Sequence, residues 1–188
     1  MPKAPINGID LYYESHGDES APTIIFAHGR GGNHMSWWQQ VAAFSSDFRC
    51  ITFDHRGWGD SIAEHGSPLR ENFISDLIAL LDYLQVDKAF LVAQSMGGFS
   101  CLGFALAHPE RTLGLVLGDT TGGVATEGTL AALDGATPPP DGPARSLAAS
   151  FIDENPAMTF LYMQICLLYT SDAADERSSV DLGGRRII

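Results

Sequence analysis

The sequence predicts an α/β fold, with a mainly parallel, twisted sheet and helices on both of its faces. Two observations carry this expectation. Short continuous apolar runs, which are typical of strands buried on both faces, alternate with segments of helical periodicity. Strands separated in this way pair in parallel, and the connecting helices cover the sheet. A chain of 188 residues, 45% of them apolar, is long enough to form one such core.

Five segments are predicted as strands. The first, over residues 9–15, is expected to be an early antiparallel strand. The others lie at residues 23–27, 49–53, 89–93 and 113–117. All four are expected to be buried strands of the sheet, and three of them, at residues 23–27, 89–93 and 113–117, are the short continuous apolar runs that are typical of burial on both faces.

The first two predicted helices are indicated by capping residues at their N-termini. Ser36 and Gln39 have the spacing of a capping box, which predicts a helix from there to about residue 44. Ser67 is the expected N-cap of the second helix, and Pro68 is the proline of its first turn. The helix that follows has one apolar face. That face comprises Phe73, Leu77, Leu80, Leu81 and Leu84.

Two more helical segments follow. Residues 97–107 predict a helix that ends at His108 and Pro109. Residues 135–143, with three consecutive prolines, predict a loop. Residues 144–165 predict one or two amphipathic helices.

The charge balance excludes several kinds of partner. Acidic residues outnumber basic ones 23 to 11, giving a formal charge of −12. This argues against nucleic acid and against anionic membrane surfaces, both of which favour basic faces. No apolar run approaches the roughly 18 residues that a membrane span needs, and residues 1–14 lack the plan of a secretory signal. The three cysteines form no disulfide framework, which predicts a reduced, cytoplasmic setting.

The last residues, 166–188, differ from the rest because no strand or helix period continues through them. The segment resembles, codon by codon, the in-frame translation of a transposon-based sequencing-library adapter. On that interpretation it is expected to be a non-native, disordered tail. The alternative is an ordinary polar, mobile C-terminus.

Ser95 lies between a predicted strand and a predicted helix, flanked by Ala93 and Gly97. A sharp strand-to-helix turn there pushes the serine into a strained backbone conformation with its hydroxyl exposed. The N-terminus of the following helix and the backbone N–H of Met96 favour an oxyanion at this point. The alternative is that Ser95 is only the N-cap of that helix.

A second candidate site is the glycine-rich loop after the strand over residues 23–27. Such a loop turns backbone N–H groups toward a ligand, and we expect the N–H of Arg30 to be a second oxyanion donor. The alternative is a plain tight turn. A nucleotide loop fits less well, because no Gly-Lys-Ser/Thr is present and His34 stands where a dinucleotide fingerprint needs glycine.

The loop over residues 54–61 is expected to be mainly structural. Its glycines suit a turn, and Asp54 with Arg56 is expected to clamp it by a charge-assisted pair. His55 is interpreted as a surface group and His28 as a histidine that holds its loop.

The tryptophans offer one candidate binding residue. Trp58 is a possible wall of an apolar pocket. For Trp37 and Trp38 we expect core or surface packing.

Three glycine-containing motifs therefore occur in order, each directly after a predicted strand. They are His28-Gly29-x-Gly31-Gly32, Asp54-x-Arg56-Gly57-x-Gly59-x-Ser61 and Gln94-Ser95-Met96-Gly97-Gly98. In order and spacing they resemble the α/β-hydrolase fold family, and most of all its branch of single-domain esterases, lactonases and C–C hydrolases. The resemblance implies that Ser95 is the nucleophile and that the N–H groups of Arg30 and Met96 hold the oxyanion. A serine here argues against the aspartate-nucleophile branches, the epoxide hydrolases and haloalkane dehalogenases.

The order of catalytic residues in that family is nucleophile, acid, histidine. His108 is the only histidine after Ser95, and a rise of about 1.5 Å per helical residue places it more than about 10 Å from the serine hydroxyl, too far for a base. Asp119 follows a strand from which some branches take the acid, but the acid more commonly follows a later strand. We therefore expect this chain to be the N-terminal portion of a serine hydrolase, truncated before the last strands and inactive by itself.

The expected organisation is an N-terminal part of the α/β-hydrolase core over residues 1–122, the start of a helical cap over residues 123–165, and the tail over residues 166–188. The whole hydrolase, of which this chain is expected to be the N-terminal portion, is expected to cleave an ester, a lactone or a C–C bond in a small acyl substrate. No cofactor and no metal are expected. A non-catalytic small-molecule receptor or pseudoenzyme on the same fold, and a nucleotide-binding domain, are the alternatives.

Overall fold

The computed structural model describes residues 2–63, 69–134 and 146–167. The chain divides into two compact units, Met1–Gly123 and Val124–Ile188, and each is described by itself. No helix within the described ranges is long and apolar enough to cross a membrane.

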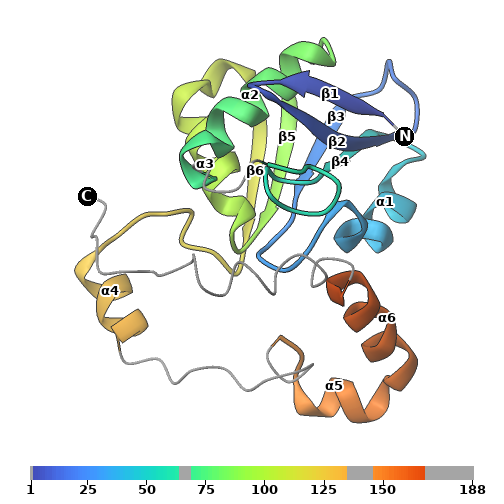
Figure 1. Cartoon of the computed structure of the whole chain (residues 1–188), viewed down its shortest axis with the longest axis vertical. Coiled ribbons are helices and arrows are strands. Elements are labelled where there is room, and N and C mark those ends of the chain that lie inside the picture. The colour runs from blue at the N-terminus through green and yellow to red at the C-terminus, as the bar shows by residue number, and fades with distance from the viewer. Residues whose placement is uncertain (1, 64–68, 135–145, 168–188) are drawn as a thin grey trace. The chain divides into compact units, whose positions relative to one another are not determined.

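The first unit is built on a six-stranded mixed sheet in the order β1-β2-β4-β3-β5-β6. The strands, drawn in Figure 1, are β1 (Lys3–Ile6), β2 (Ile9–His16), β3 (Thr23–Ala27), β4 (Arg49–Phe53), β5 (Ala89–Gln94) and β6 (Thr112–Gly118). The pairs β1–β2 and β2–β4 are antiparallel, whereas β4–β3, β3–β5 and β5–β6 are parallel. The predicted α/β class with a mainly parallel sheet is confirmed.

Strand β1 is not among the predicted elements. It pairs with β2 through a tight turn at Asn7 and Gly8, which have φ angles of +45° and +79°. Asn-Gly is the dipeptide that two-residue hairpin turns favour, because both residues tolerate positive φ. The Asn7-Gly8 dipeptide was therefore a signal in the sequence for the hairpin of β1 and β2.

Helices cover both faces of the sheet, as predicted. The alternation of side chains along the strands sends Ile25, Ala27 and Leu91 into a core with helices α2 (Phe73–Tyr83) and α3 (Gly97–Ala107). The intervening residues Ile24 and Phe26 face the opposite core. Val41 of α1 (Trp38–Phe44) and Trp37, the residue just before this helix, complete that core. Figure 1 shows α1 on one side of the sheet and α2 with α3 on the other.

The predicted start of the first helix is wrong by three residues. A short 3-10 helix, η1 (His34–Trp37), precedes α1, and its N-cap is Asn33. The Asn33 side chain accepts from the Met35 N–H at 2.9 Å, while Ser36 Oγ accepts from the Asn33 N–H at 3.0 Å. Ser36 is thus the third residue of a capping box and not its first, because asparagine is an equally good N-cap.

The second helix begins with the 3-10 turn η2 (Arg70–Asn72) and continues as α2. The predicted caps Ser67 and Pro68 lie outside the described residues. The apolar face is buried as predicted at Phe73, Leu77, Leu80 and Leu81.

The predicted burial of β6 on both faces is wrong. Leu113, Val116 and Leu117 are 46%, 58% and 39% exposed. Within the described part of the sheet β6 pairs only with β5, so it lies at an edge. An apolar run predicts a strand, but its position in the sheet order decides how much of it is covered.

The second unit contains three described helices, α4 (Glu127–Asp134), α5 (Ala149–Glu154) and α6 (Pro156–Leu167). Helices α5 and α6 confirm that residues 144–165 are helical. The predicted amphipathic character is wrong for α6, because its apolar residues are not confined to one face. Helix α4 was not predicted. Asn155 ends α5 and Pro156 opens α6, the helical position that proline favours. Helix α6 continues through Leu167, two residues into the expected tail, and residues 168–188 and the loop over 135–143 lie outside the described residues.

Candidate active site

Ser95 occupies the turn between β5 and α3 with a φ of +49°. A positive φ is uncommon for a residue with a side chain and costs about 1–3 kcal/mol. Three bonds hold this backbone: the Ser95 N–H donates to Gly118 O (3.0 Å), and the Ser95 carbonyl accepts from the Gly98 N–H (3.0 Å) and from Thr120 Oγ1 (2.6 Å). The strained turn predicted from the sequence is present. The N-cap of α3 is Met96, so the alternative reading of Ser95 as an N-cap is wrong.

Glycines allow the turn to close against its neighbours. A side chain at Gly97 would collide with the carbonyl of Ala27 in β3, and one at Gly98 would collide with Thr120 Oγ1. The first turn of α3 therefore lies directly on the strand end and on the loop that follows β6. Thr120, which no sequence motif marks, positions the elbow from that loop.

The loop after β3 lies against Ser95. A side chain at Gly29 would collide with Gln94 Oε1 and would lie 3.1 Å from Ser95 Cβ. Arg30 follows at once, and among the described residues neither its backbone N–H nor that of Met96 has a hydrogen-bond acceptor. Arg30 follows Gly29 and Met96 follows Ser95, so the N–H groups without acceptors lie next to the contact between these two residues, one in each segment.

His28 holds this loop, as predicted. It is fully buried; its Nδ1–H donates to Gly29 O (2.8 Å), and its Nε2 accepts from the His55 N–H (3.0 Å). Burial lowers the pKa of His28 from its ordinary value, because a charged ring would lose its hydration.

The interpretation of His55 as a surface group is wrong. The side chain is 1% exposed, and its ring lies against those of Phe53 and Phe73, with centroids 4.7 Å away in each case. Its Nε2 is 3.0 Å from Ser100 Oγ in α3. Burial, and secondarily the neighbouring His28, hold the pKa of His55 well below its ordinary value.

The predicted pair of Asp54 with Arg56 is also wrong. Arg56 makes a bidentate pair with Asp76 of α2, with Nε–Oδ2 at 2.8 Å and Nη2–Oδ1 at 2.7 Å. Asp76 lies on the apolar face of its helix, where a buried carboxylate needs a partner, and this was the available signal. The two loop residues diverge because Arg56 reaches α2 while Asp54 faces η1.

Asp54 instead ties two loops together. Its carboxylate accepts from the His34 backbone N–H, from His34 Nδ1 (3.0 Å) and from the Asp60 N–H (2.8 Å). Burial disfavours the charged form of His34, but the hydrogen bond and charge of Asp54 outweigh it and raise the pKa of His34. His34, Asp54 and Asp60 offer ligand atoms within 4.8 Å of one another, but donors already occupy the Asp54 carboxylate, so we assign the group no metal.

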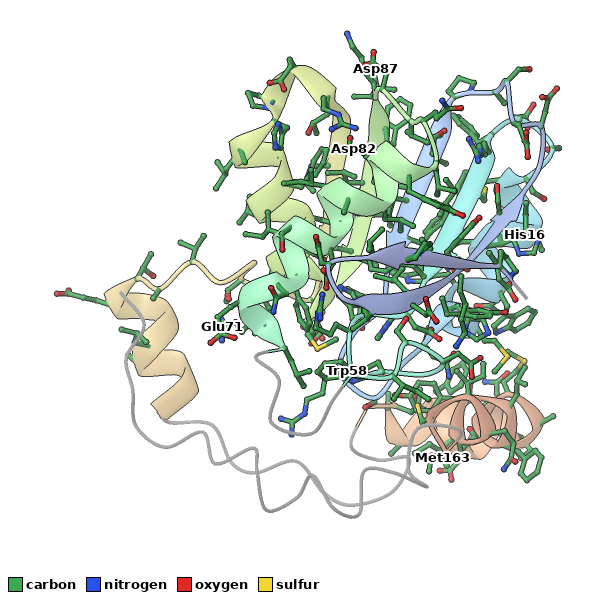
Figure 2. All side chains as sticks on the ribbon, turned by 45° about the horizontal axis from the view of Figure 1, so that its top comes forward. His16, Trp58, Glu71, Asp82, Asp87 and Met163 are labelled. Atoms are coloured by element: carbon green, nitrogen blue, oxygen red, sulfur yellow. The ribbon has the colours of Figure 1, made fainter. Side chains whose placement is uncertain are left out.

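Trp58 lies in the loop between β4 and α2 and is 9% exposed, with its ring 5.7 Å from that of Phe73. Figure 2 shows Trp58 and Glu71 at one end of the first unit and Asp82 and Asp87 at the opposite end. Trp58 as a pocket wall stays a prediction. Trp37 packs on Phe26, with ring centroids 5.3 Å apart, and Trp38 is 43% exposed.

His108 and Asp119, the polar residues after Ser95 considered for the site, differ in position. His108 follows the last residue of α3, with its ring against Phe104 (5.3 Å), at the far end of the helix from Ser95. Asp119 directly follows β6 and precedes Thr120, the residue bonded to the Ser95 carbonyl. Asp119 is thus at the same end of the sheet as Ser95, and His108 is not.

A family model described as alpha/beta hydrolase fold matches residues 22–147, more than half of the chain. The chain belongs to this family. The resemblance inferred from the three motifs is therefore confirmed.

Among curated relatives, 3-oxoadipate enol-lactonase 1 of Acinetobacter baylyi is 32% identical over 120 residues, 64% of this chain and 45% of the relative. Epoxide hydrolase 2 of Siraitia grosvenorii is 36% identical over 113 residues, 58% of this chain and 35% of the relative. The chain thus spans less than half the length of these relatives. A crystal structure of the enol-lactonase from Burkholderia xenovorans LB400 superposes with a TM-score of 0.72 at 27% identity, covering 88% of this chain and 67% of that one.

Proposed function

We propose that this chain is the N-terminal portion of a serine hydrolase that cleaves a small ester, lactone or C–C substrate through an acyl-enzyme on Ser95. The observation that carries the proposal is the strained turn at Ser95, with φ of +49° and with Gly29 against the serine Cβ. Such a turn presents a hydroxyl at the sheet edge while backbone N–H groups lie beside it. The hydrolase names of the relatives support the general class.

In the proposed mechanism Ser95 Oγ attacks the substrate carbonyl carbon, and its proton passes to a histidine. The N–H groups of Arg30 and Met96 hold the tetrahedral oxyanion, each contributing about 3 kcal/mol to transition-state stabilisation. Collapse expels the leaving group, and water then attacks the acyl-enzyme and regenerates the serine.

The base is expected from a later segment of the whole hydrolase that the 188-residue sequence does not contain, because histidine follows the nucleophile in the chain order of this family. His28 uses both ring nitrogens for its bonds to Gly29 and His55, and His108 lies at the far end of α3. A base must lie within about 3 Å of the serine hydroxyl or one water away. Turnover by residues 1–188 is therefore expected to be near background.

The serine distinguishes this proposal from the activity named for the epoxide hydrolase relative. A serine hydroxyl forms an acyl-enzyme with a carbonyl substrate, whereas an aspartate nucleophile forms an alkyl ester with an epoxide. Ser95 therefore favours carbonyl substrates, which agrees with the lactonase name of the other relative.

Acetylation of Ser95 tests the proposal. Imidazole supplied in solution replaces the missing base, so p-nitrophenyl acetate with imidazole is expected to acetylate Ser95 in the 188-residue chain, as located by peptide mass spectrometry. Ser95→Ala abolishes the modification, whereas Ser75→Ala, on the exposed side of α2, leaves it unchanged. Acetyl transfer that is indifferent to Ser95→Ala contradicts the proposal, and rapid Ser95-dependent turnover without imidazole contradicts the expected inactivity.

A further inference from the structure

Buried hydrogen bonds connect the two sides of the candidate oxyanion site. Gly29 O accepts from His28 Nδ1–H (2.8 Å), and His28 Nε2 accepts from the His55 N–H (3.0 Å). The His55 ring continues the connection to Ser100 Oγ (3.0 Å), which donates to Gly97 O (2.9 Å). The series thus runs from the residue before Arg30 to the residue after Met96, through three loop or helix segments that are distant in the sequence.

The directions of these bonds define the tautomers. The Ser100 hydroxyl has one proton, and it goes to the Gly97 carbonyl. His55 Nε2 must therefore carry a proton and donate to Ser100 Oγ. His55 Nδ1 is then an unprotonated acceptor, and among the described residues it has no partner.

Packing alone does not account for an imidazole at this place. The ring is enclosed by His28, Phe53 and Phe73, with centroids 4.6–4.7 Å away. A phenylalanine would fill the same aromatic enclosure without leaving a buried nitrogen unpaired, which has a cost of its own. The feature that only the imidazole supplies is the donor to Ser100.

We propose that His55 is a positioning residue that fixes the backbone of Arg30 and of Met96 relative to each other through its hydrogen bond to Ser100. The inference rests on the proposed function, since it assigns those two N–H groups to one oxyanion. Two donors on separate elements stabilise a transition state only when their separation is fixed in advance. His55 supplies that constraint without touching the substrate.

Amide hydrogen exchange in the 188-residue chain tests the link without any turnover. The reporters are the Gly32 N–H, bonded to Gly29 O (3.0 Å), and the Gly98 N–H, bonded to Ser95 O (3.0 Å). Both rates are normalised to the Leu84 N–H, bonded to Leu80 O in α2, so that a uniform loss of stability cancels.

Ser100→Ala is expected to speed exchange at both Gly32 and Gly98 by about tenfold, because it removes both buried bonds that the Ser100 hydroxyl makes in the series, to His55 Nε2 and to Gly97 O. The matched control is Ser75→Ala, since Ser75 Oγ likewise donates to a carbonyl three residues earlier, Asn72 O, but at an exposed site. Acceleration at Gly98 alone, with Gly32 unchanged, overturns the link.

Two variants of His55 separate the donor from the ring. His55→Gln keeps an N–H near the Nε2 position, and His55→Phe keeps the ring. Imidazole-dependent acetylation of Ser95 is expected to slow about tenfold in His55→Phe and to stay within about twofold in His55→Gln. Equal rates in the two variants overturn the positioning role. Absence of Ser95 acetylation in the wild type, with coupled exchange retained, contradicts the proposed function and leaves the link intact.

Discussion

At the residue scale, Gly29 is the point at which the loop after β3 contacts Ser95, the proposed nucleophile. A side chain there would collide with Gln94 Oε1 and press on Ser95 Cβ. The loop and the elbow are thus in contact through one glycine. The sequence marks this residue as part of a motif, but the reason for the glycine is visible only in the structure.

Gly29→Ala is therefore expected to destabilise the fold by about 1–3 kcal/mol and to abolish imidazole-dependent acetylation of Ser95, because the loop must move away from the elbow. Urea unfolding and peptide mass spectrometry measure the two effects. Gly128→Ala is the control, since its added Cβ meets only Thr126 Oγ1 at 3.9 Å. An acetylated, fully stable Gly29→Ala variant would contradict the contact.

Arg56 and Asp76 form a buried ion pair in the first unit, with side chains 7% and 3% exposed. Asp76→Asn leaves the guanidinium without its charge partner, and the free energy of unfolding is expected to fall by about 3 kcal/mol or more. Asp82→Asn, in the more exposed pair with Arg111, is expected to cost less than about 1 kcal/mol. Similar losses in the two variants would show that burial does not decide the effect.

At the element scale, the apolar patterns of the sequence predicted where most strands and helices lie. They did not predict which charged residues pair between elements, or how far the strand β6 is exposed. The runs at β3 and β5 and the apolar face of α2 were predicted because burial requires such patterns. The pairing of Arg56 with Asp76 was missed because it joins residues 20 positions apart on different elements. The burial of β6 was mispredicted because sheet order is not local information.

The loop after β4 contributes a pH dependence of stability through His55. Its pKa in the folded state is lowered, so its contribution to stability is fully present above the unfolded value of about 6.5 and is lost as the pH falls below it. The free energy of unfolding of the wild type is therefore expected to fall more steeply from pH 7 to pH 5 than that of His55→Gln. Urea titrations at each pH give the comparison, and identical slopes would contradict the buried neutral imidazole.

At the scale of the whole molecule, the exposed apolar edge is the feature with the largest consequence for behaviour in solution. Strand β6 exposes Leu113, Val116 and Leu117, and an apolar edge strand pairs readily with other chains. We expect the 188-residue chain to aggregate and Val116→Lys to raise the monomer fraction in size-exclusion chromatography. Ile62→Lys, at an equally apolar site outside any strand, is the control. A monodisperse wild-type monomer would contradict this expectation.

We propose that Ser95 is a nucleophile and that N–H groups from two separate elements hold its oxyanion, so residue, element and molecule act together. The measurement that tests it most directly is a crystal structure of the chain with a phosphonate bound covalently to Ser95. The account predicts a phosphonyl oxygen within about 2.7–3.1 Å of the backbone nitrogens of both Arg30 and Met96. A phosphonyl oxygen directed to solvent, or a phosphonate on another residue, would contradict it.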